Sequence, residues 1–414
     1  MTQNKLPQVN SQRLWDSLMQ MAEIGLTEKG GCNRQALTGL DKLGRDVFVD
    51  WCKEIGCEIL VDEIGNIFAR HPGKDNSLPA VITGSHLDTQ PTGGKFDGVY
   101  GVLAGLEVLR TLADNNIVTR HPIEVVVWTN EEGARFSPAC MGSGVWSGNF
   151  DVQQIYQTKD KDGLTVGDEL DNIGYKGVLK AQPRPIKAAF EAHIEQGPIL
   201  EKSQKQIGVV TGIQGLRWYD LSLKGVPCHA GPTPMEDRKD PVQALLPILQ
   251  SCYQMATKNG PWGRATIGDI QALPGSPNTV PEELRVSIDI RHPQAEVIEE
   301  MASKFAESVH RYSRNYSVGY QLSETWRMEV TEFDPLCINA VQEAVDKLGY
   351  NHMKMFSGAG HDSLYVAQRV PTSMIFVPCK DGLSHNEAEH ASQDDLAAGA
   401  NVLLNAMLSL AQES

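Results

Sequence analysis

The 414-residue sequence lacks the features that mark several protein classes. It has no run of about 18 apolar residues, so we expect no membrane span. Its start, MTQNKLPQVNSQRLWDSLMQ, has no basic segment followed by an apolar one, which predicts no signal peptide and a cytoplasmic location. The eight cysteines form no CxxC pair, which argues against a disulfide framework and against a thiolate zinc site.

Basic surface and several catalytic motifs are missing as well. The net charge is -15 and no local basic patch offsets it, so we expect neither nucleic-acid nor membrane binding. No G-x-S-x-G elbow, phosphate-binding loop or dinucleotide fingerprint occurs. The stretch HNEAEH lacks the spacing of a zinc-protease helix, because His385 and His390 are five residues apart instead of four.

The remaining pattern predicts an α/β fold with two parts. Apolar runs rich in β-branched residues at 79–84, 123–128, 188–194 and 373–378 read as buried strands, and helical patterns lie between several of them. This alternation predicts a mostly parallel sheet. From 212 to 327 the order becomes β-α-β-β-α-β, which predicts an inserted α+β domain with a four-stranded antiparallel sheet. We therefore expect one domain built from 1–211 and 328–414, and a second from 212–327.

Imidazoles and carboxylates follow four of the predicted strands of the first domain. Ligands of an open α/β sheet bind beyond the carboxyl ends of its strands, so these side chains are candidates for one site. The candidates are His86 and Asp88, Glu131 and Glu132, His193 with Glu195 and Gln196, and His385. Each motif alone can be interpreted without a functional site, as a turn, a solvated loop or a hydrogen-bonded core histidine. Their occurrence together at strand exits favours a common site.

The ligand types indicate a metal centre. Three imidazoles with two or more carboxylates suit zinc or a similar divalent ion, and a shared carboxylate would allow two ions. Asp97, in the glycine-flanked stretch GGKFDG at the start of a predicted helix, is the best candidate for that bridge. Asp88 could accept the second ring proton of His86 and fix its tautomer.

With these residues identified, the chain resembles the di-zinc N-carbamoyl-L-amino-acid hydrolases over nearly its whole length. That family groups with β-ureidopropionases and allantoate amidohydrolases within the larger superfamily of zinc aminoacylases and exopeptidases. The stretches that carry the resemblance are GSHLDTQPTGGKFDG, TNEEGARF, EAHIEQGPILE, GVPCHAGPTPMEDRKDP, PNTVP, DIRHP, GAGHDS and SHNEAEH.

The resemblance assigns roles to the metal-site candidates. It implies that His86 and His193 hold one zinc ion, that Glu132 and His385 hold the other, and that Asp97 bridges them. Glu131 is then the general base; spacing alone does not tell it from Glu132. Manganese or cobalt accept the same ligands as zinc.

The resemblance also implies a dimerisation or lid role for the inserted domain, and a homodimer. His229, Asn278 and Arg291 match family residues that reach substrate in the partner subunit's active site. His229 is expected to stabilise the oxyanion, and Arg291 and Asn278 to bind the substrate carboxylate. Without the resemblance, His229 reads as a structural histidine and Arg291 as half of a surface ion pair. Gln196 and Gly360 are expected to border the ureido group.

The implied activity is hydrolysis of N-carbamoyl amino acids to amino acid, carbon dioxide and ammonia. Allantoate amidohydrolase and β-ureidopropionase are alternatives, because pocket walls decide between ureido substrates. An aminoacylase or dipeptidase would use the same metals on an acyl or peptidyl substrate. A non-catalytic binding protein on this fold is a further alternative, although such a protein should have lost ligands.

Overall fold

The computed structural model describes residues 6–413, which form two compact units. One unit comprises the chain up to Gly212 and from Glu332 onward, and the other comprises Ile213–Thr331. The second unit is therefore inserted into the first.

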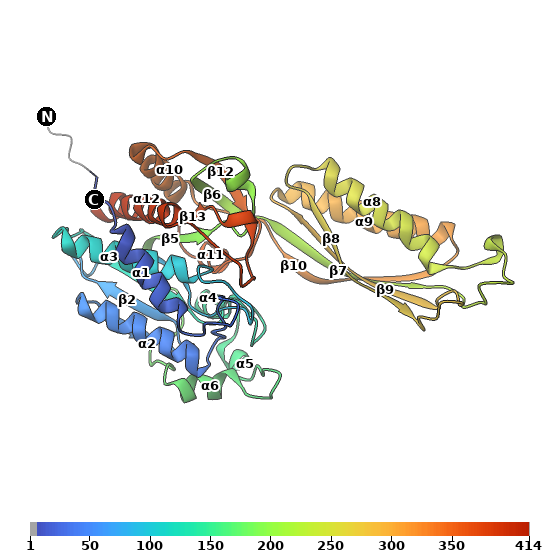
Figure 1. The fold of residues 1–414 in the computed structure, drawn as a ribbon, viewed down its shortest axis with the longest axis horizontal. Helices are drawn as coiled ribbons and strands as arrows, with labels where there is room; N and C mark the ends of the chain where they lie inside the picture. The colour runs from blue at the N-terminus through green and yellow to red at the C-terminus, as the bar shows by residue number, and fades with distance from the viewer. Residues whose placement is uncertain (1–5, 414) are drawn as a thin grey trace. The chain divides into compact units, whose positions relative to one another are not determined.

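A single large sheet forms the centre of the first unit (Figure 1). Its strand order is β1-β2-β4-β3-β5-β13-β6-β11, and β12 pairs with β6. The bounds are β1 Glu58–Val61, β2 Ile67–His71, β3 Ala80–His86, β4 Ile123–Trp128, β5 Ile186–Ile194, β6 Ile207–Ile213, β11 Thr331–Glu332, β12 His352–Ser357 and β13 Thr372–Val377. The central run β4-β3-β5-β13 is parallel, whereas β1, β2 and β6 pair antiparallel. This confirms the predicted sheet, with antiparallel strands flanking its parallel centre.

Helices cover both faces of this sheet, because its central strands alternate apolar side chains toward each face. Val81 and Val125 belong to the core beneath α1, α3, α10 and α12, whereas Ile82 and Val126 pack on the face of α4 and α11. The helices of the unit are α1 Ser11–Ala22, α2 Gly39–Glu54, α3 Val99–Asp114, α4 Met141–Trp146, α5 Val152–Tyr156, α6 Val166–Ile173, α7 Ile199–Lys202, α10 Pro335–Leu348, α11 Ser363–Val366 and α12 Gln393–Gln412, with a 3-10 turn at Lys380–Gly382. No helix within residues 6–413 has the length and apolar character needed to cross a membrane.

The start of α3 explains why Asp97 is available for other contacts. The helix begins at Val99, and its N-cap is Gly98 with φ of 66° and no capping side chain. A Cβ at Gly98 would lie 2.3 Å from the imidazole of His86, so both the backbone conformation and the close approach require glycine there. Asp97 thus precedes the cap by one residue, and its carboxylate does not cap the helix.

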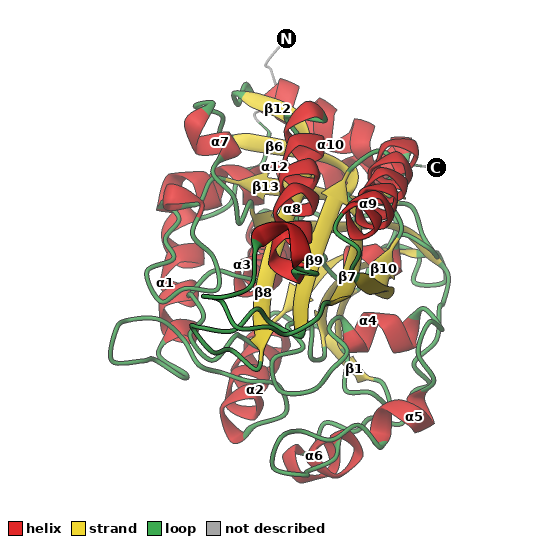
Figure 2. Cartoon of the chain, turned by 90° about the vertical axis from the view of Figure 1, so that its right-hand side faces the viewer, coloured by secondary structure: helices red, strands yellow, loops and turns green. Residues whose placement is uncertain are grey.

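The second unit has the predicted β-α-β-β-α-β order. Its elements are β7 Gly215–Lys224, a 3-10 turn at Met235–Asp237, α8 Pro241–Lys258, β8 Arg264–Leu273, β9 Glu283–His292, α9 Ala295–Asn315 and β10 Gly319–Met328. The antiparallel sheet has the order β10-β7-β9-β8, and both helices lie on one face of it (Figure 2). Leu221, Val286 and Phe305 belong to the apolar core between the helices and the sheet. The predicted fold class is confirmed.

Candidate metal centre

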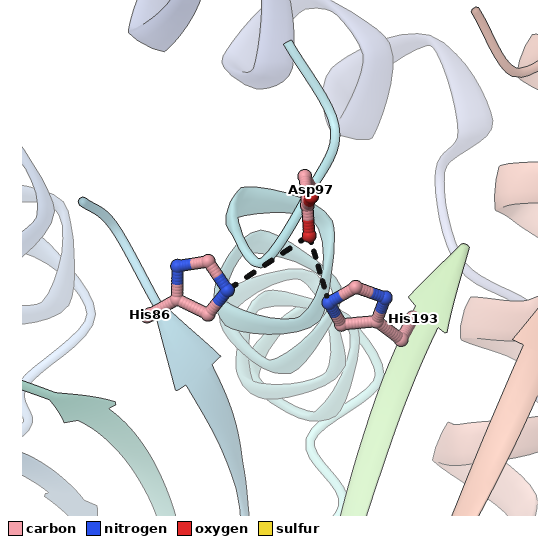
Figure 3. Close-up of side chains that lie close together, drawn as sticks. All are labelled: His86, Asp97 and His193. Atoms are coloured by element: carbon pink, nitrogen blue, oxygen red, sulfur yellow. Dashed lines mark ion pairs between the residues drawn. The ribbon is translucent and has the colours of Figure 1, made fainter. Parts of the chain in front are cut away.

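Asp97 faces two histidines that stand at the ends of neighbouring parallel strands (Figure 3). His86 is the last residue of β3, and His193 is the second-last residue of β5. Oδ1 of Asp97 lies 3.2 Å from Nε2 of His193 and 3.9 Å from Nε2 of His86. All three side chains are buried. Their ligand atoms therefore converge on one point at the carboxyl end of the sheet.

The other oxygen of Asp97 belongs to a second group of ligand atoms. Oδ2 of Asp97 lies 3.4 Å from Nε2 of His385, which in turn lies 3.2 Å from Oε2 of Glu132. His385 adopts a left-handed backbone conformation with φ of 52°, a strained geometry that often marks functional positions. Asp97 is thus shared by two candidate metal-binding groups, His86–Asp97–His193 and Asp97–Glu132–His385.

Two features of these ligands fit bound cations. Oδ1 of Asp97 is buried and has no hydrogen-bond partner, which is costly unless a ligand satisfies it. The Nδ1 atoms of His86 and His193 contact the main-chain carbonyls of Asp88 and Ile194 at 2.8 and 2.9 Å. These contacts assign a ring proton to Nδ1 and make Nε2 the atom that faces Asp97. Nε2 of His193 also accepts a hydrogen bond from the backbone N–H of Gly98 over 3.2 Å, which a metal ion at this atom would replace.

The pKa values of the site show strong electrostatic coupling. Burial alone would lower the pKa of His193, but contact with Asp97 and its charge, together with the charge of Glu191, raise it to about 9. Contact with Glu132 and the charges of Glu132 and Asp97 raise the pKa of His385 to about 9, although burial opposes this. Burial alone would raise the pKa of Asp97, but the contact with His193 and the imidazole charges hold it well below its usual range. Asp97 and the neighbouring imidazoles therefore stabilise each other's charged forms.

His86 contacts the main chain of Asp88, and not the carboxylate that had been expected. His86 bonds to the main-chain carbonyl of Asp88, whereas the Asp88 carboxylate lies 3.9 Å from Nδ1. That carboxylate instead accepts hydrogen bonds from the backbone N–H groups of Glu131 and Glu132, over 3.3 and 3.2 Å. The carboxylate of Asp88 therefore orients the glutamate pair, and its main chain orients the imidazole.

Glu131 and Glu132 turn toward different parts of the site. Oε2 of Glu131 lies 3.4 Å from Nε2 of His86, whereas Glu132 lies beside His385. Burial raises the pKa of Glu131 well above its usual value, and the charges of Asp362 and Glu132 add to this. A raised pKa suits a carboxylate that must take up a proton near neutral pH.

Gln196 also contacts Asp97. Its Nε2 donates to Oδ2 of Asp97 over 2.9 Å and lies 3.2 Å from Oγ of Ser384. The assignment of nitrogen to this end follows from the carboxylate, which can only accept. The other end of the amide, Oε1 of Gln196, is buried without a hydrogen-bond partner. Gln196 therefore presents an unsatisfied acceptor within the site.

The remaining predicted residues do not belong to the candidate metal-binding groups. Gly360 is exposed and precedes the buried His361 in the first unit. His229 and Asn278 are exposed in the second unit, where the backbone of Ala230 donates to the carbonyl of Asn278 over 2.9 Å. The structure thus brings the segments of His229 and Asn278 side by side.

Arg291 lies on β9 of the second unit and is paired with a carboxylate. Its Nε lies 3.0 Å from both oxygens of Asp289, and its second terminal nitrogen donates to Oδ2 of Asp289 over 2.7 Å. The ion pair that the sequence alone suggested for Arg291 is therefore formed in this structure, with Asp289 as the partner.

Several residues around the site were not among the sequence candidates. Gln90 donates to the carboxylate of Glu132 through its backbone, over 3.1 Å, and its side chain, over 2.8 Å. Glu191 and His361 form a third group with His193, and Glu191 is fixed by the hydroxyls of Ser85 and Ser363. Glu389 contacts the backbone of Asp97 from 292 positions along the chain. Gln90, His361 and Glu389 stand inside quoted motifs, but no spacing rule distinguishes them.

Comparison with known proteins defines the family. The model of peptidase family M20/M25/M40 matches residues 82–409, and the chain belongs to that family. An N-carbamoyl-L-amino-acid amidohydrolase of Rhizobium meliloti is 46% identical over 404 residues, covering 98% of this chain and 97% of the relative. An amidase of the hydantoinase/carbamoylase family from Burkholderia multivorans superposes with a TM-score of 0.96 at 50% identity, covering 98% of this chain and 99% of that structure. An allantoate amidohydrolase of Bacillus subtilis is 33% identical over 413 residues, covering 99% of this chain and 100% of the relative.

Within the M20 family, the chain is a member of the hydantoinase/carbamoylase group. This agrees with the resemblance inferred from the motifs.

Proposed function

We propose that the chain hydrolyses N-carbamoyl-L-amino acids, adding one water and releasing the amino acid, carbon dioxide and ammonia. The proposal depends above all on the shared carboxylate of Asp97, whose two oxygens face two separate sets of histidine and glutamate ligands. Full-length similarity to N-carbamoyl-L-amino-acid amidohydrolases supports the choice of substrate.

The residues present fit two divalent ions, with zinc as the first candidate. His86 and His193 would hold one ion, Glu132 and His385 the other, and Asp97 both. When bound, such ions polarise the ureido carbonyl and lower the pKa of water toward ~7. Manganese and cobalt fit the same donor set.

The chain's own groups perform the proton transfers. Glu131, buried beside His86 and with a raised pKa, takes the proton of the attacking water and returns it to the leaving amine. Asp88 holds the backbone of Glu131 during both steps. His229 is assigned to the developing oxyanion, where one such donor typically contributes about 2.7–4 kcal/mol.

Gln196 favours a ureido substrate over an acylated one. The terminal amino group of a carbamoyl substrate can donate to the unsatisfied Oε1 of Gln196, whereas the methyl group of an N-acetyl substrate cannot. Sites that hydrogen-bond a substrate reject analogues that leave their polar groups unpaired. This argues against the aminoacylase alternative; allantoate, which also carries ureido groups, is not separated by this contact.

Arg291 and Asn278 are assigned to the substrate carboxylate. A guanidinium can bind a carboxylate through two parallel hydrogen bonds, which a simple urea would not require. The exchange of Asp289 for substrate is then part of binding, because Asp289 occupies the guanidinium in this structure. Apart from the adjacent residues of the chain, no described atom lies within 4 Å of where a Gly360 side chain would begin, which leaves room beside it for the ureido end.

The second unit supports a homodimer. β8 is an edge strand of its sheet and exposes Ile270 and Leu273. The adjacent helix α8 exposes Val242, Leu246 and Tyr253 at intervals of four and seven residues, which form one stripe. Unpaired edge strands invite pairing with another chain, and a two-fold symmetric pair would cover both features.

Ammonia release tests the proposed substrate. With added zinc, the enzyme should release ammonia from N-carbamoyl-L-methionine and cleave N-acetyl-L-methionine far more slowly. Ammonia release is measured in parallel with N-carbamoyl-β-alanine and with allantoate. The preferred substrate distinguishes a β-ureidopropionase or an allantoate amidohydrolase from the proposed enzyme. Cleavage of the acetyl substrate without ammonia release from any ureido compound would overturn the proposal in favour of an aminoacylase.

A further inference from the structure

The carboxylate of Glu389 is buried next to the proposed metal bridge but is not one of its ligands. Glu389 is 5% exposed and lies in the segment that follows His385. Its Oε1 accepts hydrogen bonds from the backbone N–H groups of Phe96 and Asp97, over 2.9 and 3.1 Å. One carboxylate oxygen therefore holds the main chain on both sides of the Phe96–Asp97 peptide.

The hydroxyl of Ser384 lies between the second oxygen of Glu389 and the side chain of Asp97. Oγ of Ser384 lies 3.2 Å from Oε2 of Glu389 and donates to Oδ2 of Asp97 over 2.8 Å. Asp97 is thus held at its backbone by Glu389, and at Oδ2 by Ser384 and Gln196, whereas Oδ1 is left without a hydrogen bond. These contacts fix the direction of the carboxylate without occupying its inner oxygen.

The loop before Asp97 packs directly against Glu389. A Cβ added at Gly94 would lie 2.1 Å from both Cδ and Oε1 of Glu389. Space for the carboxylate therefore depends on glycine at this position. The backbone of Gly94 is not in the left-handed region, so an alanine is compatible with its main-chain conformation. The added Cβ would also lie 2.5 Å from Cβ of Glu389, so the whole Glu389 side chain would have to move away from the Phe96–Asp97 backbone.

We propose that Glu389 is a positioning residue that sets the place of the Asp97 carboxylate between the two metal sites, acting through the Phe96–Asp97 backbone and Ser384. The inference rests on the proposed function, in which Asp97 is the bridge. Residues that orient metal ligands typically change metal affinity or activity by about 10–100-fold when they are removed.

A purely structural role would give a different result, and Glu107 provides the matched control. Glu107 is also a fully buried glutamate whose carboxylate accepts a backbone N–H, from Asn10 over 3.0 Å, and it pairs with Arg13. It lies on α3, the helix that follows Asp97. Its hydrogen bonds are to Asn10, Arg13 and Thr111, none of which is a proposed metal ligand. Glu107→Ala should lower thermal stability and leave metal binding unchanged.

The test measures metal binding by the full-length protein, independent of turnover. Metal-free Glu389→Ala, Gly94→Ala, Glu389→Gln and Glu107→Ala are titrated with zinc against a chromophoric chelator, and the Co(II) absorption spectrum of each is recorded. Glu389→Ala and Gly94→Ala should lower the affinity for at least one ion by about 10–100-fold and alter the cobalt spectrum. Glu389→Gln should recover most of the loss, because its amide oxygen can still accept both backbone N–H groups.

The outcomes separate this inference from the proposed function. Wild-type affinity for two ions and an unchanged cobalt spectrum in Gly94→Ala or in a folded Glu389→Ala would overturn the inference alone. Equal loss of affinity in Glu107→Ala would also overturn it, by showing a general effect of stability. Failure of the wild-type protein to bind two ions would instead overturn the proposed function.

Discussion

The side-chain amide of Gln196 donates to the carboxylate of Asp97 over 2.9 Å, while the amide's carbonyl oxygen is buried with no hydrogen-bond partner. In the proposed function, the same residue orients the metal bridge and offers an acceptor to substrate. This relationship links the metal centre to the choice between ureido and acyl substrates.

Substitution of Gln196 by Met should weaken the preference for ureido over acyl substrates. The thioether keeps the length of the side chain but is only a weak acceptor. We expect the ratio of kcat/KM for N-carbamoyl-L-methionine to that for N-acetyl-L-methionine to fall by about 10–100-fold, corresponding to the loss of a hydrogen bond to a buried group. The ratio cancels effects on the metals that both substrates share. A ratio unchanged from wild type would remove Gln196 from the recognition of the ureido group.

Glu131→Gln should bind both ions and lose turnover. The amide is nearly isosteric but cannot take up a proton, and general-base catalysis typically contributes about 10²–10⁴-fold. Metal content and kcat are measured on the same preparation. If the variant keeps most of its kcat, the base is another residue.

Arg291→Ala should raise KM for N-carbamoyl amino acids. Loss of a hydrogen bond to a charged group costs about 1.5–3 kcal/mol, or roughly 10–150-fold in affinity. Any activity toward a ureido compound without a carboxylate should be unaffected, which provides the control. Equal kinetics with wild type on carboxylate substrates would place Arg291 outside the site and leave its pairing with Asp289 as its role.

Leu246→Glu should dissociate the proposed homodimer. Leu246 is 64% exposed in the apolar stripe of α8, and a charge there would be buried without a partner in a two-fold interface. Sedimentation velocity should show a dimer for wild type and a monomer for the variant. The control is Val178→Glu, at a residue that is 95% exposed in the first unit. A monomeric wild-type protein, or a dimer in both variants, would contradict the assigned interface.

Metal binding should release protons. The pKa of His193 and that of His385 are each raised to about 9 in the metal-free chain, by Asp97 and by Glu132. Metal ions bind neutral imidazole, so each ion should displace about one proton at pH 7 and progressively fewer as the pH passes 9. Titration calorimetry in buffers of different ionisation enthalpy measures this number. Proton release that stays constant from pH 7 to 10 would contradict the coupling.

The same shifts predict how the metal-free chain responds to pH. A histidine whose folded pKa is raised contributes stability that is fully present below its unfolded pKa of about 6.5 and is lost as the pH rises through the folded value. The contribution of His193 should therefore disappear between about pH 6.5 and 9. Thermal melts in chelator across this range should show it, and the metal-loaded protein should lack the effect.

The strands and their polar exits were predictable, because buried parallel strands read as continuous apolar runs. Ile123–Trp128 matches its predicted range, and the other central strands match within two residues. The joint position of His86 and His193 followed from the rule that parallel strands end at one edge. Asp97 was predicted from its glycine-flanked place at a helix start. The pattern of neighbouring residues along the chain was sufficient to predict these strands and the polar residues that follow them.

Contacts between distant segments were not predictable. Glu389 reaches Asp97 across 292 positions, and no periodicity encodes that hydrogen bond. The role of Asp88 was assigned to its carboxylate because spacing does not distinguish side chain from carbonyl, whereas the structure bonds His86 to the carbonyl. Likewise, the spacing did not show which of Glu131 and Glu132 faces which part of the site. The turn after β4 determines the direction of each side chain.

Anomalous diffraction from crystals grown with zinc tests the central claim most directly. We expect two peaks on either side of Asp97, one beside His86 and His193 and the other beside Glu132 and His385. A single peak, or zinc bound away from Asp97, would contradict a site in which this carboxylate bridges two ions.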